Sequence, residues 1–492
     1  MVETPIVITF VAYFIGLTGI GLYFWRKNRS VEDYLLGGRE MGAWVTALSA
    51  QASDMSGWLL MGLPGAIYVS GLSDSWIAVG LFIGTVLNWC LVSGRLRIYT
   101  QATESITLPC FFEERFADPT GLLRSLSAMI ILVFFTIYAS SGLVATGRLF
   151  ESTFDISYQT AVLSGCAIIV LYTFLGGFMA VCWTDLFQGL LMLGAVVVVP
   201  VLAYHQIGGR SAIEMAMQAK GISKSLIPDT KIPALTIISA MAWGLGYFGQ
   251  PHILTRFMSV KTLHKLNKSK IIAIVWVAIS LSAAVMIGLV GIGMFEALDV
   301  AQKDHEKVFI HMIGQVMGPW IGGIMLAAIL SAIMSTIDSQ LLVSSSALTE
   351  DFYQKILKRN ATEKEVVFIG RLCVIIISVV ALALALNPKD SILGIVSYAW
   401  GGLGAAFGPL VLCALFCRRT TWQAALAGMV CGTVVLVVWK QVGLSATLYE
   451  LVPGFVTNGL VILTVSHFFP QSQTPVLDQY AEVVKVFEKH RS

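Results

Sequence analysis

The chain has 492 residues and a formal net charge of +3, with 56% hydrophobic and only 12% charged residues. A soluble protein of this length would carry roughly 25% charged residues and would divide into domains joined by polar linkers. This sequence does neither. Its composition therefore excludes a soluble enzyme or a nucleic-acid-binding protein and indicates an all-α polytopic membrane protein.

Apolar windows of about 20 residues, the length that crosses a bilayer, recur along the chain. The first, Ile6 to Trp25, is preceded by no basic residue and lacks a small-residue cleavage site, so we expect a retained helix and not a signal peptide. Residues 1–470 are expected to form one transmembrane domain, and the polar residues 471–492 a cytoplasmic surface helix. About thirteen spans are predicted, near residues 6–26, 43–70, 75–95, 125–149, 158–178, 185–207, 233–258, 271–296, 312–345, 366–387, 392–417, 423–441 and 449–470.

The distribution of Lys and Arg predicts the orientation of the chain. An odd number of spans puts the two termini on opposite sides of the membrane. Of the 32 Lys and Arg residues, 23 fall on the side of Arg26, Lys27 and Arg29 and of the C-terminus. Because cytoplasmic segments of membrane proteins are enriched in these residues, we expect the N-terminus outside and the C-terminus in the cytoplasm.

Motifs for direct ATP use and for metal or organic cofactors are missing from the sequence. The seven histidines show no metal-ligand spacing, and no glycine-rich phosphate-binding loop ends in lysine. ATP-driven transport would need a separate subunit. We expect no organic cofactor, no nucleic-acid partner and no obligatory protein partner.

The second span contains an aspartate, Asp54, where a bilayer-spanning helix should hold only apolar atoms. An ionisable group at that depth costs roughly 2.5–3.5 kcal/mol on insertion scales, so its presence points to an ion or a water-filled path. Gly57, Gly62, Pro64 and Gly65 follow it closely. Such residues interrupt a helix and free backbone carbonyls for coordination, which predicts a broken helix here.

A second glycine- and proline-rich interruption, residues 243–252, lies five spans later. Because five is odd, the two broken spans are expected to cross the membrane in opposite directions. Paired broken helices in matching positions of two halves indicate an inverted-repeat transporter, with substrate and ion held at the midplane. The repeats would cover residues 43–207 and 233–417. The alternative is that Gly and Pro are simply common in membrane helices, where Gly also serves close packing.

The ninth span carries the hydroxyl pair Ser335 and Thr336. A hard monovalent cation prefers oxygen ligands, and such a pair facing the free carbonyls of another helix would supply them without a full charge. This pattern suggests a sodium site. Hydroxyls in membrane helices also bond back to the carbonyl four residues earlier, so the span alone leaves that alternative open. Asp338 lies about 200° round the helix from Thr336 and is expected to face a different environment.

Five short strings carry a resemblance to a known family. They are ASDMSGWLLMGLPG (52–65), YTFLGGFMA (172–180), WGLGYFGQPH (243–252), MST (334–336) and SYAW (397–400). Over about residues 10 to 470 the chain resembles the sodium:solute symporter family, and the first and third strings resemble its proline-carrying branch. The resemblance implies a LeuT-type core of five plus five helices, with one helix before it and two after it. It also implies that one sodium ion is carried with one L-proline.

Site residues follow from the same resemblance. Sodium would be bound by three backbone carbonyls and two hydroxyls, those of Ala52, Met55, Ala332, Ser335 and Thr336. Asp54 would supply a carboxylate needed for sodium affinity, by direct contact or by shaping the local field. Substrate would be bound by Ser56, Gly62, Tyr138, Trp243, Tyr247 and Pro251.

Chemistry agrees with a proline substrate. A zwitterion with an aliphatic ring needs a dipole or hydrogen-bond partner for its carboxylate, an acceptor for its ammonium and an apolar wall. The ends of broken helices could supply the first two, and aromatic rings, Trp58 among them, the third. Aromatic residues in membrane helices also serve packing alone.

Arg39 and Asp185 resemble family residues that affect coupling or ion release. Each has a simpler alternative: Arg39 as a positive-inside anchor, and Asp185 as the N-cap of the sixth span. The contribution of Asp338 to ion affinity stays open.

The expected function is therefore sodium-coupled import of L-proline across a bacterial cytoplasmic membrane. Two alternatives remain. One is a symporter of the same family for betaine, pantothenate or a sugar, or one coupled to protons through Asp54. The other is a membrane sensor or passive channel, although the short C-terminal tail argues against a fused sensor domain.

Overall fold

The computed structural model describes residues 3–25, 31–175, 177–357 and 361–491. Among these residues the regular structure is helical throughout, apart from one isolated bridge between Met41 and Val260. Arg26, Lys27 and Arg29, used above for orientation, and Gly176 of the glycine pair lie outside the described residues.

The first half of the chain forms eleven α-helices. They are α1 (Thr4–Trp25), α2 (Val31–Leu36), α3 (Ala43–Asp54), α4 (Leu63–Ser70), α5 (Ser75–Leu87), α6 (Ser93–Ala102), α7 (Leu108–Phe116), α8 (Leu122–Phe154), α9 (Tyr158–Leu175), α10 (Phe178–Gln206) and α11 (Arg210–Ala219). Short turns of 3-10 or π type connect some of them: η1 (Gly37–Arg39), η2 (Trp58–Gly62), η3 (Gly71–Asp74) and η4 (Asn88–Val92).

The second half continues in the same way. Its helices are α12 (Pro233–Met241), α13 (Pro251–Ser259), α14 (Leu263–Met294), α15 (Val308–Val316), α16 (Pro319–Ser346), α17 (Glu363–Ala385), α18 (Ile392–Phe416), α19 (Trp422–Gln441), α20 (Leu451–Phe468) and α21 (Thr474–Arg491). The 3-10 and π segments are η5 (Ala242–Gly249), η6 (Asp304–Lys307), η7 (Ala347–Leu357) and η8 (Leu444–Ala446), of which η7 is an 11-residue π-helix. The helix expected for the polar C-terminal residues is α21.

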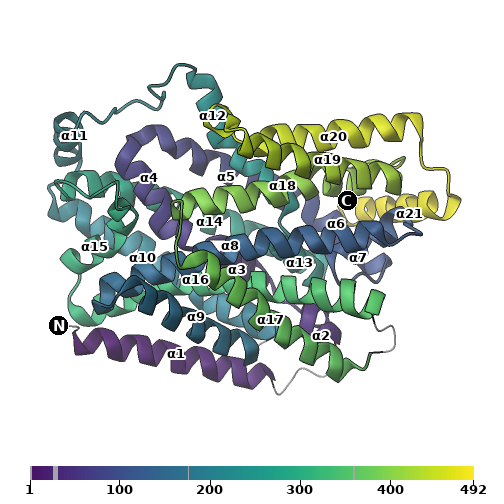
Figure 1. Cartoon of the computed structure of the whole chain (residues 1–492), viewed down its shortest axis with the longest axis horizontal. Helices are drawn as coiled ribbons and strands as arrows, with labels where there is room; N and C mark the ends of the chain where they lie inside the picture. Colours follow the sequence, from purple (N-terminus) through teal and green to yellow (C-terminus); the bar gives the residue numbers. More distant parts are fainter. Residues whose placement is uncertain (1–2, 26–30, 176, 358–360, 492) are drawn as a thin grey trace.

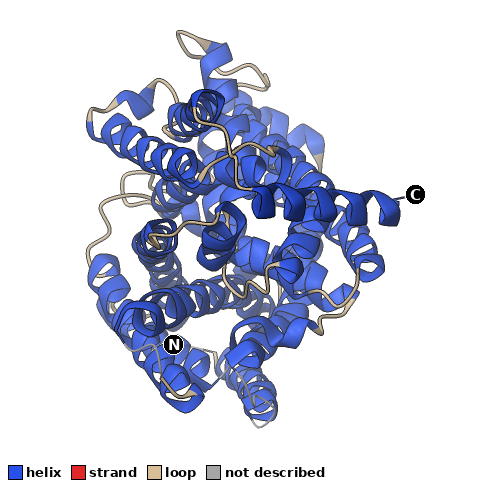
Figure 2. Cartoon of the chain, turned by 90° about the vertical axis from the view of Figure 1, so that its right-hand side faces the viewer, coloured by secondary structure: helices blue, strands red, loops and turns tan. Residues whose placement is uncertain are grey.

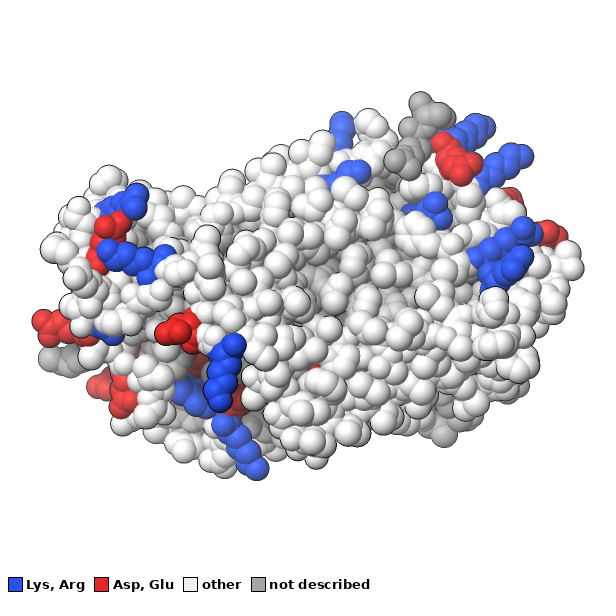
Figure 3. Space-filling view, turned by 90° about the horizontal axis from the view of Figure 1, so that it is seen from above, with Lys and Arg blue, Asp and Glu red and all other residues white. Residues whose placement is uncertain are grey.

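Most long helices run side by side along the long axis of the molecule (Figure 1). Helices α11 and α15 lie at one end, and α7 and α21 at the other; Figure 2 looks onto that second end, with α21 in front. Charged residues gather at the two ends, and the surface between them is almost free of them in Figure 3. This is the surface of a protein that spans a bilayer.

Ten helical segments of the described residues are long and apolar enough to cross a membrane, against about thirteen expected from the sequence. The numbers differ for two reasons. The run Trp58–Ala102 joins two expected spans through the turn at Gly71, and two other expected spans are not among the ten. Those two are α9, with its apolar stretch Tyr158–Thr173, and the broken segment α12–η5–α13. The prediction of a polytopic helical membrane protein is confirmed.

The two broken spans run in opposite directions. The Met41 amide donates to the Ser259 carbonyl over 3.2 Å, and the Lys261 amide donates to the Met41 carbonyl over 3.1 Å. This pairing puts the start of α3 beside the end of α13. The chain therefore enters the first broken span at the end of the molecule where it leaves the second.

Close backbone contact joins α5 to the second broken span. A Cβ added at Gly84 would overlap the carbonyl group of Gly244, and one added at Gly80 would overlap the backbone of Met241. Small residues at such a crossing let two membrane helices approach through their backbones. Gly84 and Gly244 thus set the position of η5 in the bundle.

Substituting Gly84 by alanine is expected to lower the free energy of unfolding by about 1–3 kcal/mol, because overpacking against backbone cannot be relieved by a rotamer change. The midpoint of thermal unfolding in detergent measures the loss. Gly314→Ala on α15, where a Cβ would meet no atom within 4 Å, serves as the control and should not lower the midpoint. Equal losses in the two variants would contradict the role of Gly84.

Candidate ion and substrate site

The first break lies directly after Asp54, as the sequence predicts. Helix α3 ends there, Met55 has non-helical backbone angles (φ −82°, ψ 79°), and helical structure resumes in the π-turn η2. The Ser56 amide bonds to the Asp54 carbonyl over 3.0 Å, and not to the Ala52 carbonyl four residues back. The Ala52 carbonyl is therefore available to a partner outside its own helix.

Asp54 connects the two breaks. Its Oδ2 accepts a hydrogen bond from the Tyr247 hydroxyl of η5 over 2.5 Å, and its backbone carbonyl accepts from Trp58 Nε1 over 3.0 Å and from the Tyr138 hydroxyl over 3.5 Å. The side chain has no exposed surface, and Oδ1 accepts no hydrogen bond from any described residue. A buried carboxylate thus keeps one free oxygen between the two interrupted helices.

The second break is stabilised by α18. Segment η5 is a 3-10 helix that ends at Gln250 in extended conformation, before Pro251 opens α13. Trp400 Nε1 donates to the Trp243 carbonyl over 2.8 Å, and the Gln250 side-chain amide donates to the Gly246 and Trp400 carbonyls. A Cβ at Gly246 would overlap the Trp400 ring, so only glycine permits this contact. Trp400 from α18 and Gln250 from the break itself thus satisfy carbonyls that the interrupted helix leaves free.

Of the six substrate candidates, Ser56, Tyr138 and Tyr247 bond to Asp54, and Trp243 reaches it through the Trp58 ring. Ser56, Tyr138, Trp243 and Tyr247 are 1–6% exposed, so the surrounding helices close them off from both ends of the molecule. Ring contacts connect the aromatic members to each other and to neighbours: Trp58 with Trp243 at 6.4 Å between centroids, Tyr247 with Trp400 at 5.0 Å, and Trp243 with Tyr449 at 5.8 Å.

The other two substrate candidates face elsewhere. A side chain at Gly62 would point to Leu393 at the start of α18, one turn beyond Trp58. Pro251 lines a narrow crevice with Ile131 and Leu342, nearer the end that holds α7. Neither has a described contact with Asp54.

The sodium candidates on α3 and α16 come together. The Ser335 hydroxyl lies 2.8 Å from the Ala52 carbonyl and 3.1 Å from the Ala332 carbonyl. The Thr336 hydroxyl lies 3.4 Å and 3.2 Å from the same two oxygens. Met55 lies at the break three residues after Ala52 and is fully buried. Carbonyl and hydroxyl oxygens without a full charge are a donor set suited to a hard monovalent cation.

Asp338 faces a different environment from the hydroxyl pair, as expected. Its Oδ1 accepts a hydrogen bond from the Thr173 hydroxyl of α9 over 2.5 Å, and its Oδ2 accepts none from any described residue. Like Asp54, it is a fully buried carboxylate.

Asp185 lies well inside a helix, so the N-cap alternative is wrong. Helix α10 begins at Phe178 after the N-cap residue Gly177, two turns before Asp185 and seven residues before the predicted start of this span. An aspartate can lie inside this helix because Ser49 and Arg256 bind its carboxylate within the bundle. Asp185 accepts from the Ser49 hydroxyl over 2.6 Å and from Arg256 over 3.3 Å, with both charged side chains fully buried.

Arg256 is the functional candidate that sequence reasoning missed. It also donates to the Ser49 hydroxyl over 3.1 Å and to the Ser339 hydroxyl over 2.5 Å. Together with Asp185, this arginine joins helices α3, α10, α13 and α16. The signal was present in the sequence, because a cation inside a predicted span (233–258) is as unusual as an aspartate there.

Arg39 is directed into the protein, with a side chain only 13% exposed. Its guanidinium donates to the carbonyls of Met258, Thr100 and Ser105 over 2.8–3.1 Å, and Glu32 lies 3.7 Å away. Burial lowers its pKa, an effect that Glu32 opposes. Arg39 therefore joins the ends of α6 and α13, which is more than anchoring at the membrane surface requires.

Comparison with known proteins defines the class. The family model described as "Sodium:solute symporter family" matches residues 34–432. The chain is 46% identical to the "Sodium/proline symporter" of Escherichia coli (strain K12), over 98% of this chain and 96% of that protein. It is also 46% identical to the "High-affinity proline transporter PutP" of Bacillus subtilis (strain 168), over 94% of this chain and 98% of that protein.

Solved structures agree on the fold. The structure of a substrate-bound, outward-open "Na+-coupled sialic acid symporter" superimposes with a TM-score of 0.80 at 19% identity, covering 96% of this chain and 99% of that one. The nucleobase-cation-symport-1 family transporter Mhp1 gives a TM-score of 0.55 at 14% identity, with coverage of 92% and 99%. The protein is thus a multi-pass membrane transporter. It belongs to the sodium:solute symporter family, which confirms the resemblance drawn from the sequence.

The pair Asp185–Arg256 allows a double-mutant cycle. Arg256→Met should lower the free energy of unfolding by about 3–5 kcal/mol, since it leaves a buried carboxylate without its cation. Combining it with Asp185→Asn should recover much of that loss, because no unpaired charge remains. Thermal unfolding of the two single variants and the double variant measures the coupling. Strictly additive losses would mean that the two residues do not act as a pair.

Proposed function

We propose that the protein imports L-proline coupled to Na+ by alternating access. The contact between Asp54 and Tyr247 carries this proposal, because it joins the two broken helices of opposite direction at a closed, aromatic-lined site. Relatives that share 46% of their residues with this chain over almost their whole length bear the names of proline transporters, which supports proline as the solute.

Sodium is proposed to bind between α3 and α16. Its ligands would be the carbonyls of Ala52, Met55 and Ala332 and the hydroxyls of Ser335 and Thr336. The mutual distances of 2.8–3.4 Å between the hydroxyls and the carbonyls of Ala52 and Ala332 support a shared ion. Asp54, two residues after Ala52, would add the negative charge that raises cation affinity.

Proline is proposed to bind beside this ion. Trp58, Trp243 and Tyr247 would enclose the pyrrolidine ring, and Tyr138 and Ser56 would offer hydroxyls to its polar groups. The free Oδ1 of Asp54 would accept a hydrogen bond from the secondary ammonium of proline or would lie beside the sodium ion. Gly62 and Pro251 would act indirectly, through α18 and through the position of α13.

Thirteen spans in a LeuT-type arrangement are part of the proposal. This number is supported by the ten long segments if the run Trp58–Ala102 is divided at Gly71 and the segments α9 and α12–η5–α13 are counted as spans. The repeats would cover residues 43–207 and 233–417 within one domain of residues 1–470. The N-terminus would lie outside a bacterial cytoplasmic membrane and α21 inside. We propose no catalytic activity, organic cofactor, nucleic-acid partner or obligatory protein partner.

One sodium ion per proline suffices for accumulation. Moving one charge through about 100 mV yields roughly 2.3 kcal/mol, and a tenfold sodium gradient adds about 1.4 kcal/mol. Together these support roughly a 400-fold gradient of a solute without net charge. Coupling requires that sodium change the relative stability of the outward- and inward-open states. A sodium ion that bridges α3 and α16 would do so by fixing the break that binds proline.

Uptake of labelled proline into proteoliposomes tests the proposal, with sodium, lithium and proton gradients imposed separately. Accumulation should require the sodium gradient and should be competed by unlabelled proline but not by betaine, pantothenate or sugars. Accumulation on a proton gradient alone would favour proton coupling through Asp54. Flux that never concentrates proline would indicate a channel.

Asp54→Cys is expected to impair sodium-dependent uptake far more than folding, because it removes the carboxylate but keeps a small side chain. Initial rates across sodium concentrations measure the effect, with thermal unfolding as the check on folding. Normal sodium activation in this variant would remove Asp54 from the ion site.

Thr336→Ala should raise the sodium concentration for half-maximal uptake by about tenfold, the factor expected from losing roughly 1.4 kcal/mol of binding energy. Ser331→Ala is the matched control, since Ser331 lies on the same helix and its hydroxyl bonds back to the Ala327 carbonyl over 2.8 Å. A similar rise in both variants would point to a general effect on α16.

Trp243→Ala should mainly weaken proline affinity and leave the sodium requirement nearly unchanged, because it removes one wall of the proposed pocket. The half-saturating proline concentration at fixed sodium measures this. Trp320→Ala, at an exposed tryptophan of α16, is the control. Unaltered proline affinity in Trp243→Ala would exclude that ring from the pocket.

A further inference from the structure

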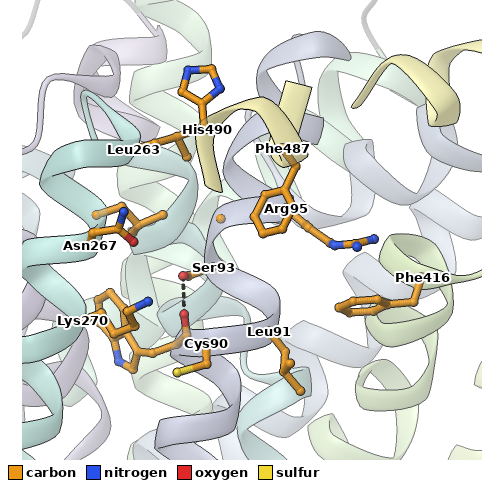
Figure 4. Close-up of a pocket in the computed structure, with 13 residues that line it drawn as sticks. Cys90, Leu91, Ser93, Arg95, Leu263, Asn267, Lys270, Phe416, Phe487 and His490 are labelled. Atoms are coloured by element: carbon orange, nitrogen blue, oxygen red, sulfur yellow. Dashed lines mark hydrogen bonds between the residues drawn. The ribbon is translucent and has the colours of Figure 1, made fainter. Parts of the chain in front are cut away.

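A cavity of about 370 Å³ lies at the end of the molecule that holds α21 (Figure 4). Its walls come from four parts of the chain. The turn η4 and helix α6 form the floor, α14 one side and Phe416 the other, and the end of α21 covers it with Phe487 and His490. The C-terminal helix is therefore part of this cavity.

The charged side chains that line the cavity are basic. Arg95 and Lys270 reach it from opposite sides, His490 lies above it, and none of its lining residues is Asp or Glu. The Arg95 guanidinium lies over the rings of Phe416 and Phe487, at 4.4 Å and 5.1 Å from their centroids, and donates to the Leu415 carbonyl over 3.0 Å. These contacts hold the guanidinium in place instead of leaving it free in solvent.

Apolar surface continues from the cavity along two of the segments that line it. On the α5–η4–α6 segment, Leu87 and Leu91 precede Arg95 at intervals of four residues, and they are 41% and 43% exposed. On α14, Ile271 and Val275 follow Lys270 and are 64% and 53% exposed. Residues four apart lie on one face of an α-helix, so Ile271 and Val275 form an exposed apolar stripe on α14 that continues from the cavity-lining Asn267. Leu87 and Leu91 expose apolar surface on the segment that leads to Arg95.

We propose that this cavity binds the headgroup of an anionic phospholipid. The phosphate would lie between Arg95 and Lys270, and the acyl chains along the exposed apolar surface of α5 and α14. Basic pockets between membrane helices on the cytoplasmic side suit such headgroups, and a cation near the surface contributes roughly a fivefold gain in affinity. The cytoplasmic location rests on the proposed orientation, whereas the chemistry of the site rests on the cavity itself.

Binding of dioctanoyl phosphatidylglycerol to the purified full chain in neutral detergent tests the proposal, measured by native mass spectrometry. Dioctanoyl phosphatidylcholine and free glycerol 3-phosphate form the two comparison arms. The phosphatidylglycerol should bind at least fivefold more tightly than either, because only it combines a net negative charge with acyl chains. Equal binding of the phosphatidylcholine, or of free glycerol 3-phosphate, would overturn the proposal.

Lys270→Gln should weaken phosphatidylglycerol binding by about five- to tenfold. Lys268→Gln is the matched control, an exposed lysine on the same helix that does not line the cavity, and it should change binding less than twofold. Equal losses in the two variants would show only general attraction to a basic surface and would also overturn the proposal. Thermal unfolding and sodium-dependent uptake of Lys270→Gln, both expected to be retained, separate loss of the lipid from loss of fold or transport.

Discussion

The contact between the Tyr247 hydroxyl and the Asp54 carboxylate is the constraint on which the rest of the structure depends. Each of the two broken helices leaves polar backbone groups in the middle of an apolar bundle, where an unpaired group costs several kcal/mol. Neither break could persist alone. Asp54 accepts from Tyr247 across the gap, Ser335 bonds to the carbonyl that α3 leaves free, and Trp400 bonds to a carbonyl of η5. The two interruptions are therefore stable only beside each other and beside α16 and α18.

Such a site requires a scaffold that fixes where the breaks meet. The Met41–Val260 bridge pairs the start of one broken span with the end of the other. Glycines on α5 and η5 bring the backbones of these two segments into direct contact. Both devices act through backbone, which cannot change rotamer to absorb a misfit. A small displacement of either broken span is therefore transmitted to the Asp54–Tyr247 contact. This mechanical link is what an alternating-access transporter needs between its binding site and its two gates.

Much of this site could be predicted because it violates the usual pattern of a membrane helix. Asp54, the glycines and prolines after it, and the Ser335–Thr336 pair all stand out in apolar sequence.

The pairing of charged residues that are distant in the sequence could not be predicted. Arg256 stands 71 residues from Asp185, and only the folded chain brings them within 3.3 Å. The predicted start of α10 is seven residues too late, because an aspartate without a known cation indicates the end of a span. The break at η5 was predictable from the sequence. The side of the bundle that Pro251 faces was not, since it depends on the angle at which α13 leaves Gln250.

Two layers of polar contacts join α3 to α16, and they differ in charge. In the first layer the Ala52 carbonyl contacts the uncharged hydroxyls of Ser335 and Thr336. In the second layer, one turn away, Ser49 and Ser339 both bind Arg256, and Asp185 neutralises the charge of that arginine. The second layer has its own fixed cation, whereas the first has only oxygen atoms and a nearby carboxylate. A mobile cation in the first layer would therefore complete the interface in the same way that Arg256 completes the second. Because Arg256 sets the spacing of the two helices, the oxygens of the first layer lie at separations of 2.8–3.4 Å, and under the proposed function the fit of a cation to that spacing would decide which ion binds.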